Sequence, residues 1–418
     1  SGGTIKGNVY GGGYAYSENL TEAQQQLDSG ALYGNSNVMV SGSPTINGDI
    51  YGSGKGYNYS TVPNNSKMIG NTKVTISGTP TIGSGKIIYG AGNGLALSTT
   101  AGLTGNTTIN MNATINRSVY GGGNSTNVIG NTNVNLNASN NLAIYGGGNG
   151  TGKVSLKSSV NINNGTYGTI YGGGQNNVRE TSIIAKGGQA SYIYGGGINA
   201  NSVTTKSNVN IKGTKIIGMV CGAGGANSTT TTTNVTLTSS SATIPTVYGG
   251  GQTTTSQVTN ANINCNGATI TNIYGGSAYG GNVEKTNVKV NSGTVSNIYG
   301  GNYNSGEITQ SANITVNGGT ISSAIYGGGN GSNSKVGSAT ANATTNINII
   351  KGTISGNIYG GGNNSVVYGD TNINIGKDAV GDNSATIVSI SINGNVYGGA
   401  KATTASHIGV AGDSNAVS

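Results

Sequence analysis

The chain has little charge, few aromatic residue types and few of the residues on which enzymes and metal sites depend. Among its 418 residues, Lys and Arg number 19 and Asp and Glu 11, with one His, two Cys, four Pro, and neither Trp nor Phe. Two cysteines are too few for a disulfide framework or a four-ligand zinc site. Four prolines exclude a collagen-like chain, and no run approaches the roughly eighteen apolar residues that a membrane-spanning helix requires.

Glycine and regularly placed Val, Ile and Tyr dominate what is present. Glycine accounts for 78 of the 418 residues, far above its usual share of about 7%. The regular apolar positions argue against a disordered low-complexity chain. The first residue is Ser rather than Met and no signal-peptide pattern follows it, so we expect a mature form or a fragment.

The glycines recur in a Tyr-Gly-Gly-Gly tetrapeptide or a close variant, usually preceded by Ile or Val. The intervals between successive copies centre on about 26 residues and lengthen toward both ends, and a fixed period of this size is typical of a solenoid. The tyrosines that lead these copies are Tyr10, Tyr51, Tyr89, Tyr120, Tyr145, Tyr171, Tyr194, Tyr248, Tyr274, Tyr299, Tyr326, Tyr359 and Tyr397, and Cys221 takes this place in one further copy.

Within each repeat the apolar residues alternate with polar ones, as at Asn133–Leu136, Asn287–Val290 and Asn346–Ile349. This period of two predicts half-buried strands, and each repeat holds about three of them. Three short strands cannot bury their own apolar face, whereas stacked copies form a continuous core. The sequence therefore predicts an all-β fold, a parallel right-handed β-helix (β-solenoid) of about 13–14 coils with about 26 residues per coil.

The alternation also predicts which side chains face the core. Isoleucines before the glycine motif, such as Ile298 and Ile325, should point inward and the following tyrosines outward. In register, the tyrosines form a column, and the asparagines after the glycines form a hydrogen-bonded ladder. We interpret both as fold-stabilising, with a carbohydrate platform or a contact between rods as the functional alternative. The ladder comprises Asn124, Asn149, Asn330 and Asn363.

The whole chain, residues 1–418, is predicted to be a single β-solenoid domain with three interruptions. Residues 17–30 are expected to form a short helical or loop insertion, with Thr21 as the N-cap of a helix ending near Asp28. Residues 94–105 and 331–341 are rich in Gly, Ser, Thr and Ala and are expected to be loops on the same scaffold.

Residues able to carry out chemistry are too few and too dispersed to indicate a catalytic site. The densest acidic group, Asp370, Asp378 and Asp382, could supply oxygen ligands to Ca²⁺, but the glycine turns lack the repeated Asp of calcium-binding solenoids. His407 is the only histidine. Cys221 and Cys265 lie about two coils apart, which argues against a disulfide. We therefore predict no catalysis, no cofactor and no metal site.

The basic net charge of +8 raises the question of anionic partners. The Lys and Arg residues do not cluster and no recognition helix is evident, so we predict no nucleic-acid binding and no insertion into a membrane. Mild positive charge better fits solubility or weak adhesion to an anionic cell-wall or host polysaccharide.

The two ends of the chain carry a further hint. Gly3–Gly13 matches Gly352–Gly362, the second half of a later repeat, and the segment after Tyr397 could form a first half. Joining the end of one copy to the start of the next would complete one coil. We expect either a head-to-tail homopolymer, in which each chain's partner is another copy of itself, or an excerpt from a longer surface protein.

The Ile-Tyr-Gly-Gly-Gly-Asn units resemble the glycine-rich β-strand repeats of large bacterial and archaeal surface proteins of the adhesin-like class. This resemblance implies a β-helix located extracellularly or at the cell surface. We expect an extracellular structural protein, either a self-assembling filament or the stalk of an adhesin. A carbohydrate-binding or carbohydrate-active β-helix, similar to tailspikes or lyases, is the alternative. An ice-binding solenoid is disfavoured because Thr229–Thr233 and other threonines do not recur as a regular array.

Overall fold

A computed structural model describes residues 2–15, 30–59, 62–64, 67–94, 102–200, 202–239, 242–376 and 389–402. Within those residues every regular element is a β-strand. The chain divides into two compact units, Ser1–Ser207 (unit 1) and Asn208–Ser418 (unit 2), which are described separately. The single domain expected over the whole chain stays a prediction.

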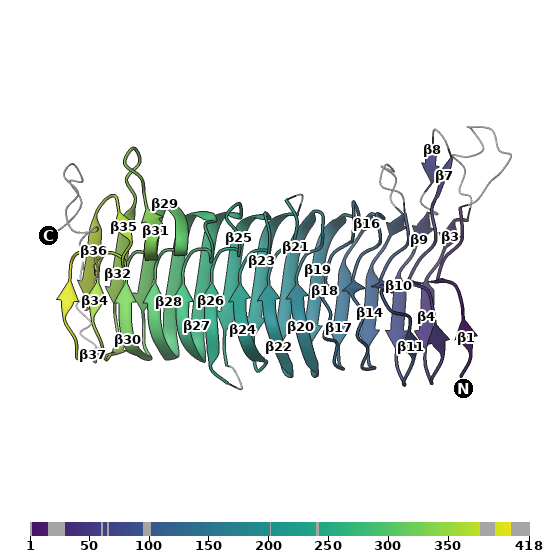
Figure 1. The fold of residues 1–418 in the computed structure, drawn as a ribbon, viewed down its shortest axis with the longest axis horizontal. Helices are drawn as coiled ribbons and strands as arrows, with labels where there is room; N and C mark the ends of the chain where they lie inside the picture. The colour runs from purple at the N-terminus through teal and green to yellow at the C-terminus, as the bar shows by residue number, and fades with distance from the viewer. Residues whose placement is uncertain are drawn as a thin grey trace, which may run out of the picture. The chain divides into compact units, whose positions relative to one another are not determined.

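Unit 1 is built from rows of parallel strands in which each strand pairs with its equivalent one coil later (Figure 1). One row carries the Ile/Val-Tyr pairs, and a second row carries the alternating polar and apolar segments. The first row is β2 (Val9–Tyr10), β6 (Ile50–Tyr51), β12 (Ile88–Tyr89), β15 (Val119–Tyr120), β18 (Ile144–Tyr145), β20 (Thr166–Tyr171) and β22 (Gln189–Tyr194). The second row is β4 (Ser36–Val40), β10 (Thr72–Ile76), β14 (Thr107–Met111), β17 (Thr132–Leu136), β19 (Val154–Ile162) and β21 (Val178–Ala185).

Shorter strands complete the coils of unit 1. A third row consists of β3 (Leu32–Tyr33), β9 (Met68–Ile69), β13 (Leu103–Thr104) and β16 (Val128–Ile129). A separate three-stranded parallel sheet consists of β1 (Thr4–Ile5), β5 (Thr45–Ile46) and β11 (Thr81–Ile82). The antiparallel hairpin of β7 (Tyr57–Tyr59) and β8 (Val62–Asn64) departs from the parallel pattern, and β23 (Val203–Ile211) spans the boundary with unit 2.

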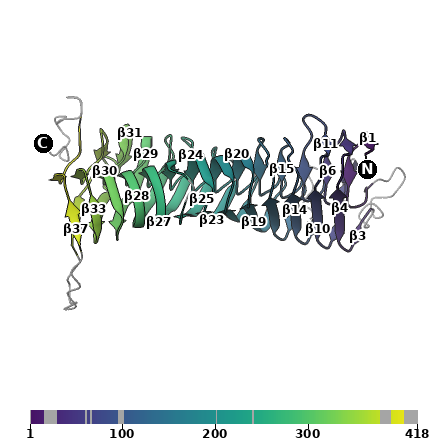
Figure 2. The ribbon, with the colours of Figure 1, turned by 90° about the horizontal axis from the view of Figure 1, so that it is seen from below.

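Unit 2 follows the same plan, but some strands continue around the corners of a coil (Figure 2). The longest, β27 and β28, replace the three short strands that the repeat predicts. The strands are β24 (Lys215–Cys221), β25 (Thr229–Leu237), β26 (Ile244–Tyr248), β27 (Gln257–Tyr274), β28 (Asn282–Tyr299), β29 (Tyr303–Val316), β30 (Thr320–Tyr326), β31 (Asn330–Val336), β32 (Thr344–Ile349), β33 (Gly352–Ile354), β34 (Ile358–Tyr359), β35 (Val366–Val367), β36 (Thr371–Ile375), β37 (Ile390–Ile392) and β38 (Val396–Tyr397).

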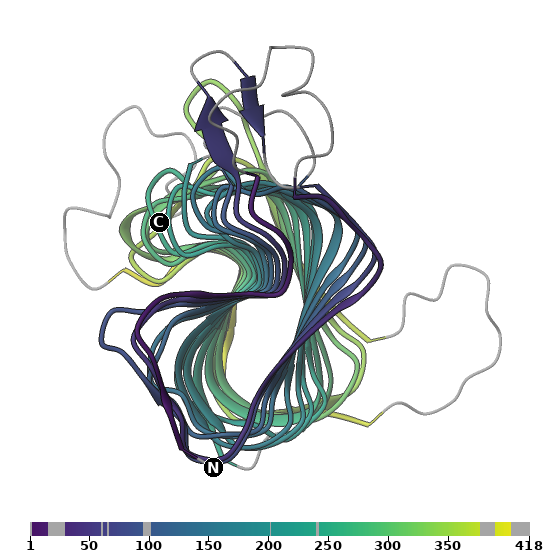
Figure 3. The same ribbon diagram turned by 90° about the vertical axis from the view of Figure 1, so that its right-hand side faces the viewer.

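The predicted parallel β-solenoid is confirmed. Ile144 pairs with Ile170 in unit 1 and Val247 with Ile273 in unit 2, and in both cases the partner lies 26 residues later. In Figure 3, where the first coils of unit 1 are nearest the viewer, the purple chain runs clockwise as it recedes, which is a right-handed sense.

The core of each unit consists of stacked aliphatic side chains from equivalent positions. The isoleucines expected to point inward, Ile273, Ile298, Ile325 and Ile358, are fully buried. Each lies directly opposite its equivalent in the neighbouring coil, as Ile298 does opposite Ile325. Burial of these columns supplies the main stabilisation of a repeat that has no core of its own.

Two of the three expected interruptions can be compared with the structure. The prediction of a loop at 331–341 is wrong for the first half of that segment. There, β31 (Asn330–Val336) pairs in register with β29 and buries Val336. Residues 94–105 are described only in part and include strand β13 (Leu103–Thr104). The insertion expected at 17–30, with Thr21 and Asp28, lies outside the described residues except for Gly30.

Candidate functional site

The tyrosines of the glycine motif form a stacked column in unit 1. From Tyr10 to Tyr194 successive rings lie 4.3–5.5 Å apart between centroids and within 18° of parallel. Parallel pairing of the Ile/Val-Tyr strands sets this spacing, because equivalent residues lie opposite one another. Stacked aromatic pairs of this kind contribute about 0.5–1.5 kcal/mol each beyond the burial of their area.

Unit 2 has a second column, from Tyr248 to Tyr397, with centroid distances of 4.6–5.2 Å between neighbouring rings of the motif. Cys221 occupies the equivalent position one coil before Tyr248 and pairs with it in register. The Cys221 side chain is fully buried, and this burial raises the pKa of its thiol well above the ordinary range. The cysteine therefore substitutes for a tyrosine in the lattice.

The tyrosines expected to face outward are nonetheless buried in the inner coils. Tyr89, Tyr274 and Tyr326 are only 2–5% exposed. Neighbouring rings cover both faces of each, and polar side chains two coils later cover some hydroxyls: Asn149 Nδ2 donates to Tyr89 Oη at 3.0 Å and Asn330 Nδ2 to Tyr274 Oη at 3.4 Å. Because the ring faces are covered, this column offers no flat platform on which a sugar could stack.

Burial also changes the acidity of the phenols. Desolvation raises the pKa of Tyr89 and of Tyr274 to about 12, although the hydrogen bonds from Asn149 and Asn330 act in the opposite direction. A neutral phenol can donate one hydrogen bond and accept another. Tyr89 and Tyr274 are thus neutral hydrogen-bonding groups at physiological pH.

The asparagines that follow the glycines form one ladder in each unit. In unit 1, Asn124 Nδ2 donates to Asn93 Oδ1 at 3.0 Å and Asn149 Nδ2 donates to Asn124 Oδ1 at 3.2 Å. In unit 2, Asn363 Nδ2 donates to Asn330 Oδ1 at 2.9 Å. Backbone bridges hold these residues opposite one another, and Lys55 and Lys401 occupy the same position in other coils.

A longer asparagine ladder runs along β23, β25, β27, β28, β29, β32 and β36, and sequence reasoning missed it. Each amide donates to the side-chain oxygen of its equivalent one coil earlier at 2.9–3.2 Å. The Asn-X-Asn alternation in the sequence is the signal from which this ladder can be predicted. The ladder comprises Asn208, Asn234, Asn262, Asn287, Asn313, Asn346 and Asn372.

A buried hydroxyl joins the two walls of a coil opposite the glycine motif. Thr286 Oγ1 donates to Gly300 O at 2.6 Å, and Thr107 Oγ1 donates to Gly121 O at 2.6 Å in unit 1. A Cβ on Gly275 would lie 2.9 Å from the Thr286 Cβ across the coil, and 2.3 Å from Gly300 O in the next coil of the same wall. Glycine is required in this narrow waist because no side chain fits between the walls.

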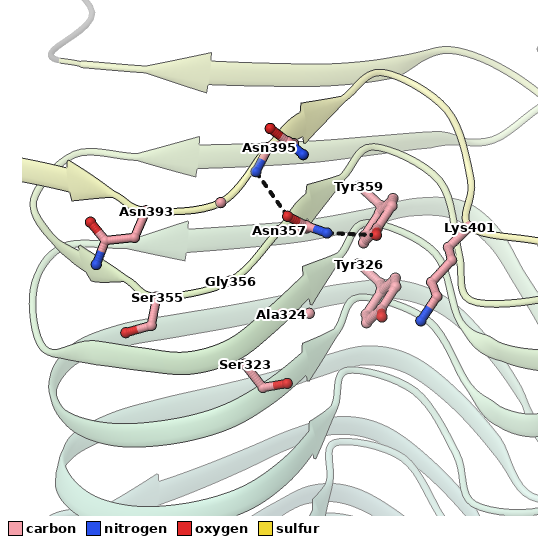
Figure 4. A pocket seen from close by; sticks show the side chains of 11 residues that line it. Ser323, Ala324, Tyr326, Ser355, Gly356, Asn357, Tyr359, Asn393, Asn395 and Lys401 are labelled. Atoms are coloured by element: carbon pink, nitrogen blue, oxygen red, sulfur yellow. Dashed lines mark hydrogen bonds between the residues drawn. The ribbon is translucent and has the colours of Figure 1, made fainter.

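A polar groove of about 480 Å³ opens beside the tyrosine column of unit 2 (Figure 4). Three successive coils line it, and the Lys401 side chain is directed toward its tyrosine side. Asn357 Nδ2 donates to Tyr359 Oη at 2.9 Å, while Asn357 Oδ1 accepts from the Asn395 backbone N–H at 2.8 Å. The lining residues are Ser323, Ala324, Tyr326, Ser355, Gly356, Asn357, Tyr359, Asn393, Gly394, Asn395 and Lys401.

The candidate chemical residues do not converge in the part of the chain that is described. Cys221 and Cys265 are both buried and free, and burial raises the pKa of each thiol. The described residues contain no group of three or more His, Cys, Asp or Glu side chains that could hold a metal ion. Asp378, Asp382 and His407 lie outside the described residues.

The comparisons with known proteins add no assignment. The chain matches no protein-family model, no curated protein and no solved structure. Among the described residues, no helix is long and apolar enough to cross a membrane. The supported description is therefore a parallel β-solenoid repeat protein whose side-chain ladders and groove are the features from which a function can be inferred.

Proposed function

We propose that the protein is an extracellular structural protein that assembles head to tail through its terminal coils. The observation that carries this proposal is the exposure of the last described coil. Val396 and Tyr397 are 44% and 43% exposed, whereas Ile358, the equivalent of Val396 one coil earlier, is fully buried. At the other end, Ile5 is 45% exposed.

The two ends offer strands that fit one another. Within the described residues, β38 pairs only with β34, and β2 pairs only with β6. Both terminal strands read Val-Tyr, and their rings stack on inner neighbours at 5.0 Å and 4.8 Å. Pairing β38 of one copy with β2 of the next would continue the tyrosine stack in the same register. Such a contact joins unlike surfaces, so it extends without closing.

The repeat style and the charge support a location outside the cell. The Ile-Tyr-Gly-Gly-Gly-Asn units resemble those of adhesin-like surface proteins, for which a solenoid stalk or filament is the expected form. The net charge of +8 suits contact with an anionic cell-wall or host polysaccharide. Antibody labelling of intact source cells tests this location, and labelling that requires permeabilised cells would contradict it.

Head-to-tail assembly is tested by sedimentation and negative-stain electron microscopy of the purified chain over a range of concentrations. The wild-type protein should form unbranched fibres, and V396D should remain as single particles because a charge on an edge strand opposes pairing. I217D is the matched control, since Ile217 is 48% exposed on strand β24, which pairs with both β22 and β26. Discrete wild-type particles at every concentration, or fibres of V396D equal to those of I217D, would refute the assembly.

A further inference from the structure

The groove of unit 2 is rich in hydrogen-bond donors. Lys401 supplies an ammonium group, which can only donate. Tyr359 Oη accepts a hydrogen bond from Asn357, so its own hydrogen is directed elsewhere. The eleven lining residues include one cation and no carboxylate. A surface with this balance favours ligands that carry acceptor oxygens and negative charge.

The groove is also held in shape before any ligand arrives. The Lys401 backbone N–H donates to Gly362 O at 2.9 Å, and its carbonyl accepts from Asn364 N–H at 2.8 Å, which fixes the base of the side chain. The Asn357 carboxamide is oriented by its bonds to Tyr359 and Asn395. A Cβ at Gly394 would lie 2.7 Å from Asn357 Oδ1, so glycine leaves room for that amide. Preorganised polar groups cost little to order on binding.

The remaining lining groups suit a hydroxylated ligand. Ser323, Ser355 and Asn393 come from successive coils and present hydroxyl and amide groups. Desolvation raises the pKa of Tyr326, so its phenol stays protonated. The ring faces are stacked on one another at 5.0 Å, so the tyrosines offer hydroxyls and edges. A volume of about 480 Å³ lies within the range of small-ligand pockets.

We propose that this groove binds an anionic saccharide, with Lys401 pairing with its acidic group and the Asn, Ser and Tyr groups bonding to its hydroxyls. The anion could be the carboxylate of a uronic acid or a sulfate ester, since both offer the same acceptor oxygens. No bond is made or broken. The last described coil contributes Asn393, Asn395 and Lys401 to the groove, so binding is tested on the unassembled chain.

Isothermal titration calorimetry of the full chain tests the site, at a protein concentration below that of any assembly. The probes are tetragalacturonic acid, a sulfated tetrasaccharide and the neutral maltotetraose. We expect saturable binding of at least one anionic probe, weakening with added salt, and none of the neutral one. Whichever anionic probe binds more tightly identifies the acidic group. No saturable binding of either anionic probe, or equal binding of maltotetraose, would overturn the proposal.

Variants locate the binding. K401Q should lower the affinity about tenfold, as expected for loss of a charged hydrogen bond. K351Q removes the same charge from an exposed lysine of unit 2 that does not line the groove, and should change the affinity less than about twofold. Y359F keeps the stacked ring and should weaken binding about threefold or more by removing one donor. Equal affinities of K401Q and K351Q, with circular dichroism showing both folded, would place the ligand elsewhere.

Discussion

The Ile/Val-Tyr dipeptide of the repeat is buried in one coil of unit 2 and exposed in another. Ile325 and Tyr326 are 0% and 5% exposed, whereas Val396 and Tyr397, in the last described coil, are 44% and 43% exposed. Glycines follow both pairs along the chain, and a small or polar residue precedes each, Ala324 in the first and Asn395 in the second. The difference is the presence of described coils on both sides of the first pair. Burial in this fold is therefore conferred by the next coil, and the local sequence only makes it possible.

The sharpest contrast should come from glycines at the waist. A Cβ on Gly327 would lie 2.1 Å from Gly360 O, a backbone atom that cannot move aside, whereas a Cβ on Gly398 meets nothing within 4 Å. We expect G327A to lower the free energy of unfolding by about 4 kcal/mol. G398A should cost less than about 0.5 kcal/mol. Urea denaturation followed by circular dichroism measures both, and equal losses would show that the waist is not the constraint.

Replacing an aliphatic side chain by alanine should produce a smaller difference in the free energy of unfolding between the same two coils. I325A removes a fully buried side chain and should cost about 3 kcal/mol through lost burial and a cavity. V396A removes a side chain that is 44% exposed and should cost less than about 1 kcal/mol. Under conditions that favour assembly the V396A loss should grow, because a second copy would bury Val396. A V396A cost that is independent of protein concentration would count against that contact.

The threonine that crosses the waist provides a smaller effect. Thr286 is fully buried and donates to Gly300 O, whereas the equivalent bond of Thr371 to Gly398 O is exposed. T286V should cost about 1–2 kcal/mol because Gly300 O loses a buried donor. T371V should cost less than about 0.5 kcal/mol, since water can replace the hydroxyl. Hydrogen exchange of the surrounding amides measures both losses. If T286V cost as little as T371V, the Thr286 hydrogen bond would contribute little to stability.

Alkaline pH should weaken the inner coils gradually. Desolvation raises the pKa of Tyr89 and Tyr274 to about 12 in the folded state, while an unfolded tyrosine ionises near pH 10. The contribution of these two tyrosines to the free energy of unfolding is complete below about pH 10. It is lost as the pH rises toward about 12, because between these values the tyrosines ionise only in the unfolded chain. The midpoint of urea unfolding should fall across this range. Y89F and Y274F should each reduce the fall, and an unchanged slope would contradict the assignment.

The sequence predicted the solenoid, its period and the inward isoleucines, because those depend on a repeat that each coil carries in full. It did not predict that Tyr89 or Tyr274 would be buried, since the covering groups, Asn149 and Asn330, come from two coils later. The bond from Thr286 to Gly300 was missed for the same reason. A Thr or Ser recurs at this position in other coils, except where Ala261 and Ala312 replace it, yet its partner across the waist is visible only after the chain has closed around the core.

A segment with the composition of a loop can also be a strand of the solenoid. Asn330–Val336 has the Gly, Ser and Asn content of a loop, but its register with β29 makes it a strand. Composition describes what a segment can do alone, whereas pairing depends on the neighbouring coil. The groove was beyond sequence reasoning because Ser323, Asn357 and Lys401 come from three different coils.

The stacked tyrosines have an optical consequence. The chain contains neither Trp nor Phe, so its near-ultraviolet absorption and emission come from tyrosine alone. Rings 4.3–5.5 Å apart in unit 1 are close enough to couple their electronic transitions and pass excitation from one phenol to the next. Each unit therefore carries an intrinsic fluorescence reporter of whether its coils remain in register.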